Sequence, residues 1–234
     1  MSQPTPLPPS EVVPGFDALG VTAFTTTRQA GSFNLGGHEP AGEVYARWIG
    51  LAGALGAARL ACAHQVHGDR ILVHDGGWSG WLRDAVGADG HLSAMAGTAM
   101  AVTLADCVPV FLAHPDGLAG VLHSGWKGTA AGITRQAIDR VAALGYDARA
   151  VRVHLGPAIC GACYEVGPEV HFAVSGARVA SPRPIDLRAA IANSVRDLVA
   201  AISISDWCTR CHNDRFYSHR GGDAGRQVGV IRIG

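Results

Sequence analysis

Short apolar segments rich in β-branched residues alternate along the chain with longer stretches in which apolar residues have helical spacing. The short segments predict strands at residues 20–27, 60–66, 70–75, 101–114, 118–123, 150–156 and 227–233. The longer stretches predict helices at residues 43–57, 128–145 and 185–202, and Asp186 stands where it can cap the last of them. Because strands and helices mix without a strict β–α–β rhythm, the pattern indicates a single α+β domain with a mixed sheet.

The composition favours a globular protein and excludes several classes of partner. Of the 234 residues, 48% are hydrophobic and 16% are charged, which is too apolar for a disordered chain. Lysine plus arginine equals aspartate plus glutamate, at 19 each, so the charge balance predicts neither a nucleic-acid nor a membrane partner. No apolar run reaches the roughly 18 residues of a membrane-spanning helix.

Residues 1–14 are polar and rich in proline, and we expect them to form a flexible lead before a single domain at residues 15–234. They contain no apolar core of a secretory signal, so the expected location is the cytoplasm. Thiols stay reduced there, and the six cysteines are therefore interpreted as buried thiols or metal ligands rather than disulfides.

The predicted strand at residues 101–114 carries two residues that are unusual in a buried strand, Asp106 and Cys107. Burial of a carboxylate is costly unless another group pairs with it. Because neighbouring strand residues point to opposite faces, we expect Asp106 to face away from Cys107. It then supports the strand through a backbone group or a cation.

A Pro-Asp-Gly turn at residues 115–117 predicts that the next strand folds back on this one. With this turn, Pro109 lies opposite His123, and Cys107 lies opposite Gly125. Cys107 and His123 then become diagonal neighbours, roughly 7–8 Å apart between backbone positions. Both side chains can reach one metal ion across that span.

A metal site needs a third ligand, and the motif HQVHG offers His64 and His67. Residues three apart in a strand point to opposite faces, so only one of these histidines can join Cys107 and His123. One cysteine, two histidines and an open fourth position form the pattern of a catalytic zinc site. The alternative is that Cys107 is a small buried hydrophobe and His123 a hydrogen-bonded core residue.

The segment HSGWKGTAAGI, which begins at His123, leads through glycines into a predicted helix. Exposed N–H groups at the start of a helix favour an anion, and Lys127 adds a positive charge. This pattern predicts an anion site, and the alternative is an ordinary glycine-rich turn between a strand and a helix.

Seven motifs together resemble the bacterial laccase-domain family, whose members are also called multicopper polyphenol oxidases and multifunctional purine nucleoside phosphorylases. They occur in the order TTTR, SFNLG, HQVHG, ADCVPVFL, HSGWKGTAAGI, LGPAICGACYEVG and CTRCHNDRFYSHR. The resemblance spans about residue 20 to the C-terminus. It implies one α+β domain with two central mixed β-sheets flanked by helices.

The resemblance also implies one zinc ion held by His67, Cys107 and His123, and so selects His67 rather than His64. Copper is a second metal that this donor set can bind. The implied activity is phosphorolysis of adenosine, inosine and methylthioadenosine to the base and ribose 1-phosphate, with adenosine deamination as a further reaction. The partners are then a small nucleoside and phosphate, and we expect a monomer or a small homo-oligomer.

On the same resemblance we assign Arg28, Ser32, Asn34 and Lys127 to substrate binding. The sequence departs from the family at two of these places. The segment between Arg28 and Ser32 is short, and Lys127 stands where arginine is common. Lysine keeps the positive charge but cannot bind an oxyanion in the bidentate manner of arginine.

Two other activities are alternatives within this family. The first is a copper-dependent polyphenol oxidase of the laccase type, but the 11 histidines include no His-x-His motif of the kind that multicopper clusters use. The second is a factor that edits peptidoglycan precursors, which no residue of the sequence supports or excludes.

Two C-x-x-C pairs, Cys160 with Cys163 and Cys208 with Cys211, raise the alternative of a closed zinc knuckle in a binding module. The gap between the pairs is longer than in a zinc ribbon and contains a predicted helix. The motif CTRCH also fits haem attachment, but it is short and comes without an export signal. We therefore interpret these four cysteines as buried thiols.

Overall fold

The computed structural model describes residues 6–234, and two six-stranded β-sheets form its centre. The first sheet has the order β1 (Ser10–Val12), β2 (Val21–Thr26), β14 (Gln227–Ile233), β7 (Thr98–Leu104), β3 (Arg59–Ala63) and β5 (Gly80–Asp84). The second has the order β13 (Ala201–Ile204), β10 (Arg152–Leu155), β8 (Val108–Ala113), β9 (Ala119–Ser124), β6 (Gly90–Ser93) and β4 (Ile71–His74). Both sheets mix parallel and antiparallel neighbours, which confirms the predicted α+β domain with two central mixed sheets.

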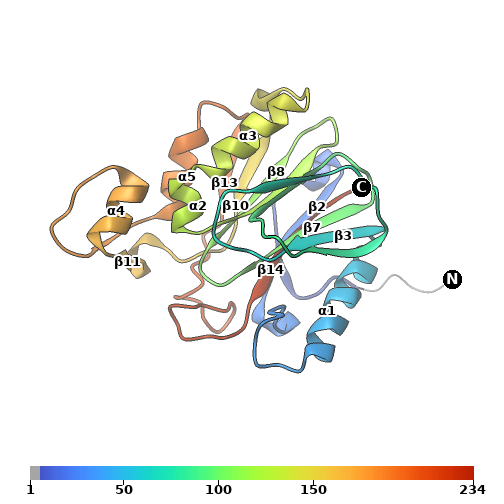
Figure 1. Ribbon diagram of the computed structural model, residues 1–234, viewed down its shortest axis with the longest axis horizontal. Helices are drawn as coiled ribbons and strands as arrows, with labels where there is room; N and C mark the ends of the chain where they lie inside the picture. Colours follow the sequence, from blue (N-terminus) through green and yellow to red (C-terminus); the bar gives the residue numbers. More distant parts are fainter. Residues whose placement is uncertain (1–5) are drawn as a thin grey trace.

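Helices lie on both sides of the paired sheets (Figure 1). They are α1 (Ala41–Ala54), α2 (Trp126–Ala130), α3 (Ile133–Ala143), α4 (Pro168–Ser175) and α5 (Leu187–Val195), with 3-10 turns η1 (Asp17–Leu19), η2 (Arg28–Ala30), η3 (Ala148–Ala150) and η4 (Gly161–Cys163). A small third sheet pairs β11 (Glu165–Val166) with β12 (Arg183–Pro184). Among residues 6–234, no helix has both the length and the apolar character to cross a membrane.

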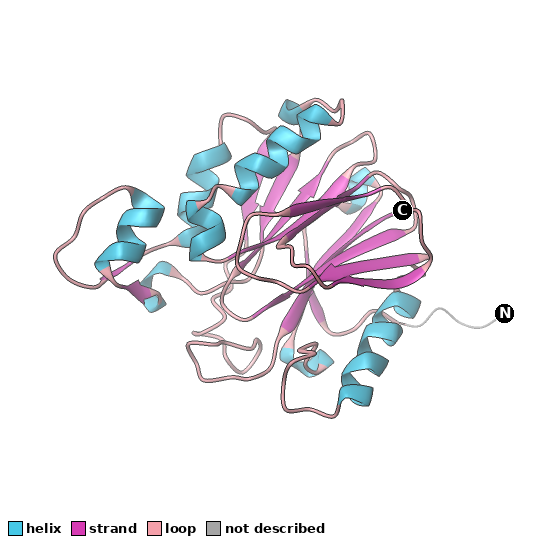
Figure 2. Ribbon diagram, viewed as in Figure 1, coloured by secondary structure: helices cyan, strands magenta, loops and turns pink. Residues whose placement is uncertain are grey.

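Apolar side chains between the two sheets hold them face to face. Met100 of β7 and Ile231 of β14 belong to one buried cluster with Phe111 of β8 and Val121 of β9. On the outer face of the first sheet, the cluster under α1 is built around Trp48. The molecule is therefore layered, with a helix, two sheets and further helices in succession (Figure 2).

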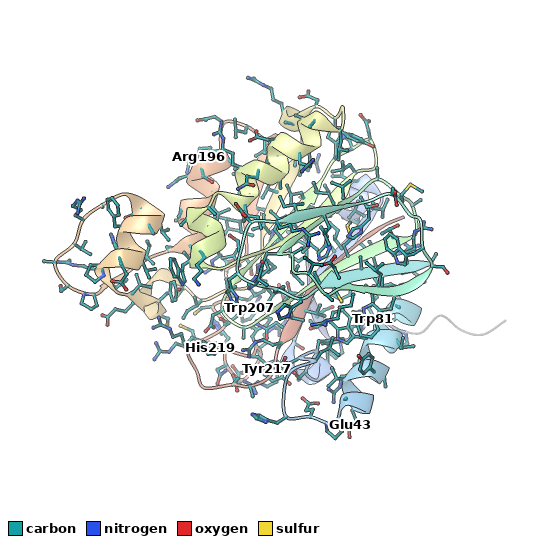
Figure 3. The ribbon with its side chains drawn as sticks, in the orientation of Figure 1. Glu43, Trp81, Arg196, Trp207, Tyr217 and His219 are labelled. Carbon is teal, nitrogen blue, oxygen red and sulfur yellow. The ribbon has the colours of Figure 1, made fainter. Side chains whose placement is uncertain are left out.

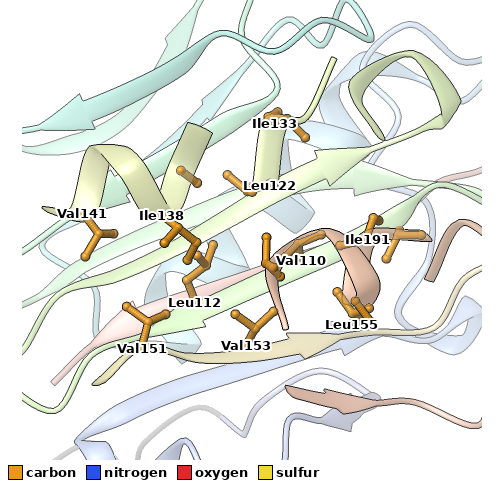
Figure 4. Close-up of a cluster of buried hydrophobic side chains, with 14 of the residues drawn as sticks. Val110, Leu112, Leu122, Ile133, Ile138, Val141, Val151, Val153, Leu155 and Ile191 are labelled. Carbon is orange, nitrogen blue, oxygen red and sulfur yellow. The ribbon is translucent and has the colours of Figure 1, made fainter. Parts of the chain in front are cut away.

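Helices α3 and α5 cover the outer face of the second sheet. Ile138 of α3 and Ile191 of α5 belong to one buried cluster with Val110, Leu112 and Val153 (Figure 4). Full burial of one such side chain contributes about 1.5–3 kcal/mol. This layer therefore anchors β8 and β10, two of the strands whose ends lie at the site described below.

The predicted strand at residues 101–114 is wrong in one respect, because it is two strands in different sheets. The chain leaves the first sheet after Leu104 and enters the second at Val108. Asp106, between them, has a φ of 84°, a left-handed conformation that extended strands do not have. The apolar pattern hides this break because the residues on both sides of it are buried.

The flexible lead predicted at residues 1–14 is a second correction. Residues 10–12 form β1, which pairs with β2 in the first sheet. The folded domain therefore begins before residue 15, while residues 1–5 lie outside the described part of the chain.

Helix boundaries also differ from the prediction. Gly132, with a φ of 75°, separates α2 from α3 within the helix predicted at residues 128–145. The helix predicted at residues 185–202 ends at Val195, and its last residues join β13. Asp186 caps α5 as predicted, since the N–H of Ala189 donates to its Oδ1 at 3.0 Å.

Three crossovers between the sheets lie at one end of the molecule. Strands β3, β5 and β7 run parallel in the first sheet, and after each of them the chain passes into the second sheet as β4, β6 or β8. The connecting residues are 64–70, 85–89 and 105–107. Strand β9 is antiparallel to β8 and returns to this end. The pairing directions bring the segments after β2, β10 and β13, and the segment before β14, to the same place.

Buried histidines make this fold sensitive to acid. His91 of β6 is fully buried, and its Nδ1 lies 2.9 Å from Nε2 of His74 in β4. Burial, and then the neighbouring His74, lower the pKa of His91 to about 3. Burial also lowers the pKa of His154 in β10 to about 4. The unfolded chain therefore binds these protons first as the pH falls below about 6.5, and the folded state is most stable above that pH.

We predict that lowering the pH from about 7.5 to about 5.5 reduces the free energy of unfolding by about 1 kcal/mol for each of these histidines. The variant His91→Gln keeps a hydrogen-bonding group beside His74. Its free energy of unfolding should fall by about 1 kcal/mol less than that of the wild type between the two pH values, as measured by urea unfolding. His38→Gln, at an exposed position, is the control. Equal pH dependence in His91→Gln and the wild type would contradict a buried neutral His91.

Candidate metal centre and its cavity

A cavity of about 610 Å³ opens at the end of the molecule where the crossovers meet. Its polar lining comes from both sheets and from the C-terminal loop, as Asn34, His64, Gln65, His67, Arg83, Asp106, Cys107, His123, Tyr164, His219, Arg220 and Arg226. His219 in the C-terminal loop lines the cavity, and Figure 3 shows it well away from Arg196 after α5. A cavity of this volume is in the range that holds a small-molecule ligand.

The predicted donors His67, Cys107 and His123 converge in this cavity. One ligand atom from each lies within 4.8 Å of the others, and the two histidine rings meet edge to face with 4.8 Å between their centroids. His123, near the end of β9, lies opposite Pro109, so the predicted hairpin register is confirmed. His64 borders the cavity but does not belong to the group.

The buried carboxylate of Asp89 orients two of the three donors. Its Oδ1 lies 2.7 Å from Nδ1 of His123, which leaves Nε2 of that ring for a ligand. The N–H groups of Val66, His67 and Gly68 donate to the same carboxylate at 3.1, 3.0 and 2.8 Å. They hold His67 at a φ of 59°, a conformation that costs a non-glycine residue about 1–3 kcal/mol.

The electrostatics of the group favour the Cys107 thiolate. Burial alone would raise the pKa of Cys107, but His123 and then His67 outweigh it and lower the pKa to about 6. Burial would lower the pKa of His123, yet the Cys107 thiolate and Asp89 raise it to about 9. The thiolate is the form of cysteine that binds metals, and a cation that displaces the His123 proton leaves the neutral imidazole that ligation requires.

Gly125 leaves room for this arrangement. A Cβ at this position would lie 2.9 Å from Sγ of Cys107 and 3.4 Å from Cδ2 of His67. The first distance is shorter than van der Waals contact, so any side chain here would displace the sulfur. The glycine two residues after His123 is therefore a packing requirement of the site.

Asp106 itself borders the cavity, and its side chain bonds to a backbone group, as the sequence indicated. The hydroxyl of Thr209 donates to its Oδ1 at 2.6 Å, and the N–H of Arg220 donates to its Oδ2 at 2.7 Å. Its backbone oxygen accepts the N–H of Ile159 at 3.0 Å. Asp106 therefore ties the turn that carries Cys107 to two distant segments of the cavity wall.

The four predicted substrate-binding residues are placed differently from one another. Asn34 lines the cavity, and buried Ser32 accepts the N–H groups of Asn34 and Arg226 behind the wall. Arg28 lies outside the lining, 2.7 Å from Asp223. Lys127 is exposed on the five-residue helix α2, with its Nζ 5.6 Å from the centroid of the neighbouring Trp126 ring. The structure thus brings only Asn34 of the four to the cavity.

Sequence reasoning missed the cations that do line the cavity, Arg83, Arg220 and Arg226. Arg226 uses its Nη1 to donate to three backbone oxygens of the C-terminal loop. The guanidinium of Arg220 lies 5.0 Å from the centroid of the Tyr164 ring. For Arg220 alone, the dense run of arginine and histidine in CTRCHNDRFYSHR was an available signal, since Arg83 and Arg226 lie outside this motif.

Comparisons with known proteins show which family the chain belongs to. The family model described as multi-copper polyphenol oxidoreductase laccase matches residues 22–234. A purine nucleoside phosphorylase of Mycobacterium tuberculosis is 36% identical over 235 residues, covering 92% of each chain. The adenosine deaminase RL5, from an unknown prokaryotic organism, is 32% identical over 196 residues, covering 74% of this chain and 75% of its own.

The crystal structure of the YfiH protein of Bacillus licheniformis has the same fold. It superposes with a TM-score of 0.86 at 24% identity, and 97% of each chain is covered. The match to the family model spans most of the sequence, and the chain belongs to the laccase-like multicopper polyphenol oxidoreductase family. The resemblance drawn from the seven motifs is thereby confirmed.

We predict that Asp89→Asn lowers the affinity of the site for zinc by about 10–100-fold, because an amide cannot accept all four hydrogen bonds that the carboxylate accepts. Affinity is measured by competition with a chromophoric chelator. Asp69→Asn, the same change at an exposed position in the crossover that carries His67, is the matched control and should bind zinc as the wild type does. Equal affinities in the two variants would show that Asp89 does not position the donors.

Proposed function

We propose that this chain is a zinc-dependent purine nucleoside phosphorylase that acts on adenosine, inosine and methylthioadenosine and also deaminates adenosine. The observation that carries the proposal is the convergence of His67, Cys107 and His123 on a cavity with arginines in its wall. Relatives named purine nucleoside phosphorylase and adenosine deaminase support the same class of reaction.

The donor set fits zinc. A thiolate and two imidazoles match the preference of zinc for sulfur and nitrogen, and three protein ligands leave one position open. The bond between Asp89 and Nδ1 of His123 fixes the ring as in histidines that bind metals. His67, Cys107 and His123 would hold the ion, which supplies Lewis-acid activation of water or of a substrate oxygen.

The surrounding side chains bind and orient the substrates. Phosphorolysis requires a phosphate held against C1′ of the ribose while the purine departs, so a cation in the wall stabilises the charge that develops. Arg220 suits this role, because its planar fork can bind two phosphate oxygens at once. Burial, and then the charge of Cys107, raise the pKa of Tyr164, so its phenol remains a neutral hydrogen-bond donor.

Copper-dependent oxidation of phenols is the second candidate. The description of the family model as a laccase and the ability of a Cys–His–His set to bind copper favour it. Among residues 6–234, potential metal ligands cluster in two places, at this set and at a set of four cysteines. Neither cluster has the many histidines of a multicopper centre. Stoichiometric copper in protein prepared without added metal would replace our choice of zinc.

We predict that the zinc-loaded protein converts adenosine to adenine when phosphate is present and to inosine when it is absent. Removal of the thiolate in Cys107→Ala should lower both rates by at least about 100-fold. Products are separated by chromatography, and circular dichroism confirms that the variant is folded. Unchanged activity in folded Cys107→Ala would overturn the proposed site.

The role of Arg220 is tested separately. Arg220→Ala should raise the KM for phosphate by about 10–100-fold, because a hydrogen bond to a charged group contributes about 1.5–3 kcal/mol. The affinity for adenosine in the deamination assay should change little. Arg196→Ala, at an exposed position far from the cavity (Figure 3), is the matched control. Equal phosphate KM values in the two variants would assign phosphate binding to another residue.

A further inference from the structure

Four cysteines gather outside the His–Cys–His group. The sulfur atoms of Cys160, Cys163, Cys208 and Cys211 all lie within 4.8 Å of one another. The interpretation of these residues as buried thiols is wrong for Cys211, which is exposed, and for Cys160 and Cys163, which are partly exposed. Cys208 is buried, so the cluster lies at the boundary between the interior and solvent and is reachable from solvent through the other three cysteines.

The sheet explains how two distant pairs meet. Strands β10 and β13 are parallel neighbours, and the chain continues beyond each of them in the same direction. The two extensions are joined by a parallel bridge between Ala158 and Cys208. The long segment between the pairs forms α4 and α5 before it returns through β13. The sequence gap that argued against a common site therefore does not separate the sulfurs in space.

The backbone around the cluster presents N–H groups to sulfur. The N–H of Cys160 and the N–H of Cys211 both donate to Sγ of Cys208, at 3.2 and 3.4 Å. Bonds of this kind orient a thiolate and offset its charge, as the outer partners of metal ligands do. Arg210 adds a positive charge, because its Nη1 donates to the backbone oxygen of Cys163 at 3.1 Å.

The spacing of the sulfurs suits one tetrahedral ion. Zinc–sulfur bonds of about 2.3 Å place the corners of a tetrahedron about 3.8 Å apart. The sulfurs of Cys163 and Cys211 are 3.4 Å apart, and the whole group stays within 4.8 Å. A disulfide bond would need about 2.05 Å.

We propose that Cys160, Cys163, Cys208 and Cys211 bind one zinc ion in a closed, structural four-thiolate site. Four protein sulfurs complete a tetrahedral shell and leave no position for a substrate. This second ion is independent of the ion proposed at Cys107.

The site would strengthen one wall of the cavity. Ile159, which precedes Cys160, donates its N–H to the backbone oxygen of Asp106, and Thr209, which follows Cys208, donates its hydroxyl to the Asp106 carboxylate. Tyr164, which lines the cavity, directly follows Cys163. An ion that joins the two pairs therefore holds together the segments that fix the turn carrying Cys107.

The test measures metal in the full chain, purified with a reductant and without added metal. Inductively coupled plasma mass spectrometry should find about two zinc ions per chain in the wild type and about one in Cys107→Ala. The double variant Cys163→Ser with Cys211→Ser should also contain about one, and Cys211→Ser alone, at an exposed position, replaces it if the double variant does not fold. The double variant and Cys211→Ser should each melt at a lower temperature than the wild type.

Cobalt(II) gives a readout that is independent of activity. Loaded into Cys107→Ala, it should show the strong sulfur-to-metal charge-transfer bands of a tetrahedral four-thiolate centre. Adding the two serine substitutions should abolish this spectrum, and the matched control Cys62→Ala, a cysteine outside the cluster, should retain it.

Three results would overturn the proposal. They are a single zinc ion that Cys107→Ala loses completely, iron in place of zinc in Cys107→Ala, and a Cys163–Cys211 disulfide in freshly purified, unreduced protein. Each of them leaves the proposed nucleoside chemistry untouched, since that chemistry depends on the ion at Cys107. The two proposals therefore fail separately.

Discussion

The pairing of the buried Asp89 carboxylate is the interaction on which the candidate site depends. A fully buried carboxylate without partners would cost several kcal/mol, so its hydrogen bonds are a condition of folding. These bonds go to the ring of His123 and to three consecutive N–H groups at residues 66–68. One side chain therefore sets the ring orientation of one donor and the backbone of another. The strained φ of His67 persists because the carboxylate holds both of its neighbours as well.

A second buried carboxylate, Asp106, has the same kind of role at another crossover. The chain must turn sharply there to leave β7 in one sheet and enter β8 in the other, and the left-handed φ of Asp106 makes the turn. Its two oxygens accept groups from Thr209 and Arg220, so the turn is fixed from the C-terminal part of the chain. Cys107 owes its position to this break between the sheets, and the polar residue that looked out of place in a strand is the residue that ends it.

The sequence predicted the features that depend on neighbouring residues and missed those that depend on residues far away along the chain. The register that pairs Pro109 with His123 depends on a three-residue turn with its own chemistry, and it was predicted correctly. The break at Asp106 depends on partners more than 100 residues away, and an apolar run gives no sign of it. The alternation of strand faces did not apply to the choice between His64 and His67, because both lie in a crossover loop, and only the resemblance to the family separated them. Arg220 was missed because a loop residue has no periodicity that reports its direction.

The four cysteines are another feature that sequence spacing did not predict, and their proximity bears on function. Spacing along the chain argued against a common site, but parallel strands bring their extensions together whatever length of chain connects them. The two groups of donors then differ in the feature that decides their chemistry. The His–Cys–His group has three donors on a cavity and, in the proposed zinc site, would leave a coordination position open, whereas the four sulfurs of the second proposed site would saturate a tetrahedral ion. Asp106 forms hydrogen bonds to segments beside both groups, so the proposed four-thiolate site would help to fix the turn that positions Cys107.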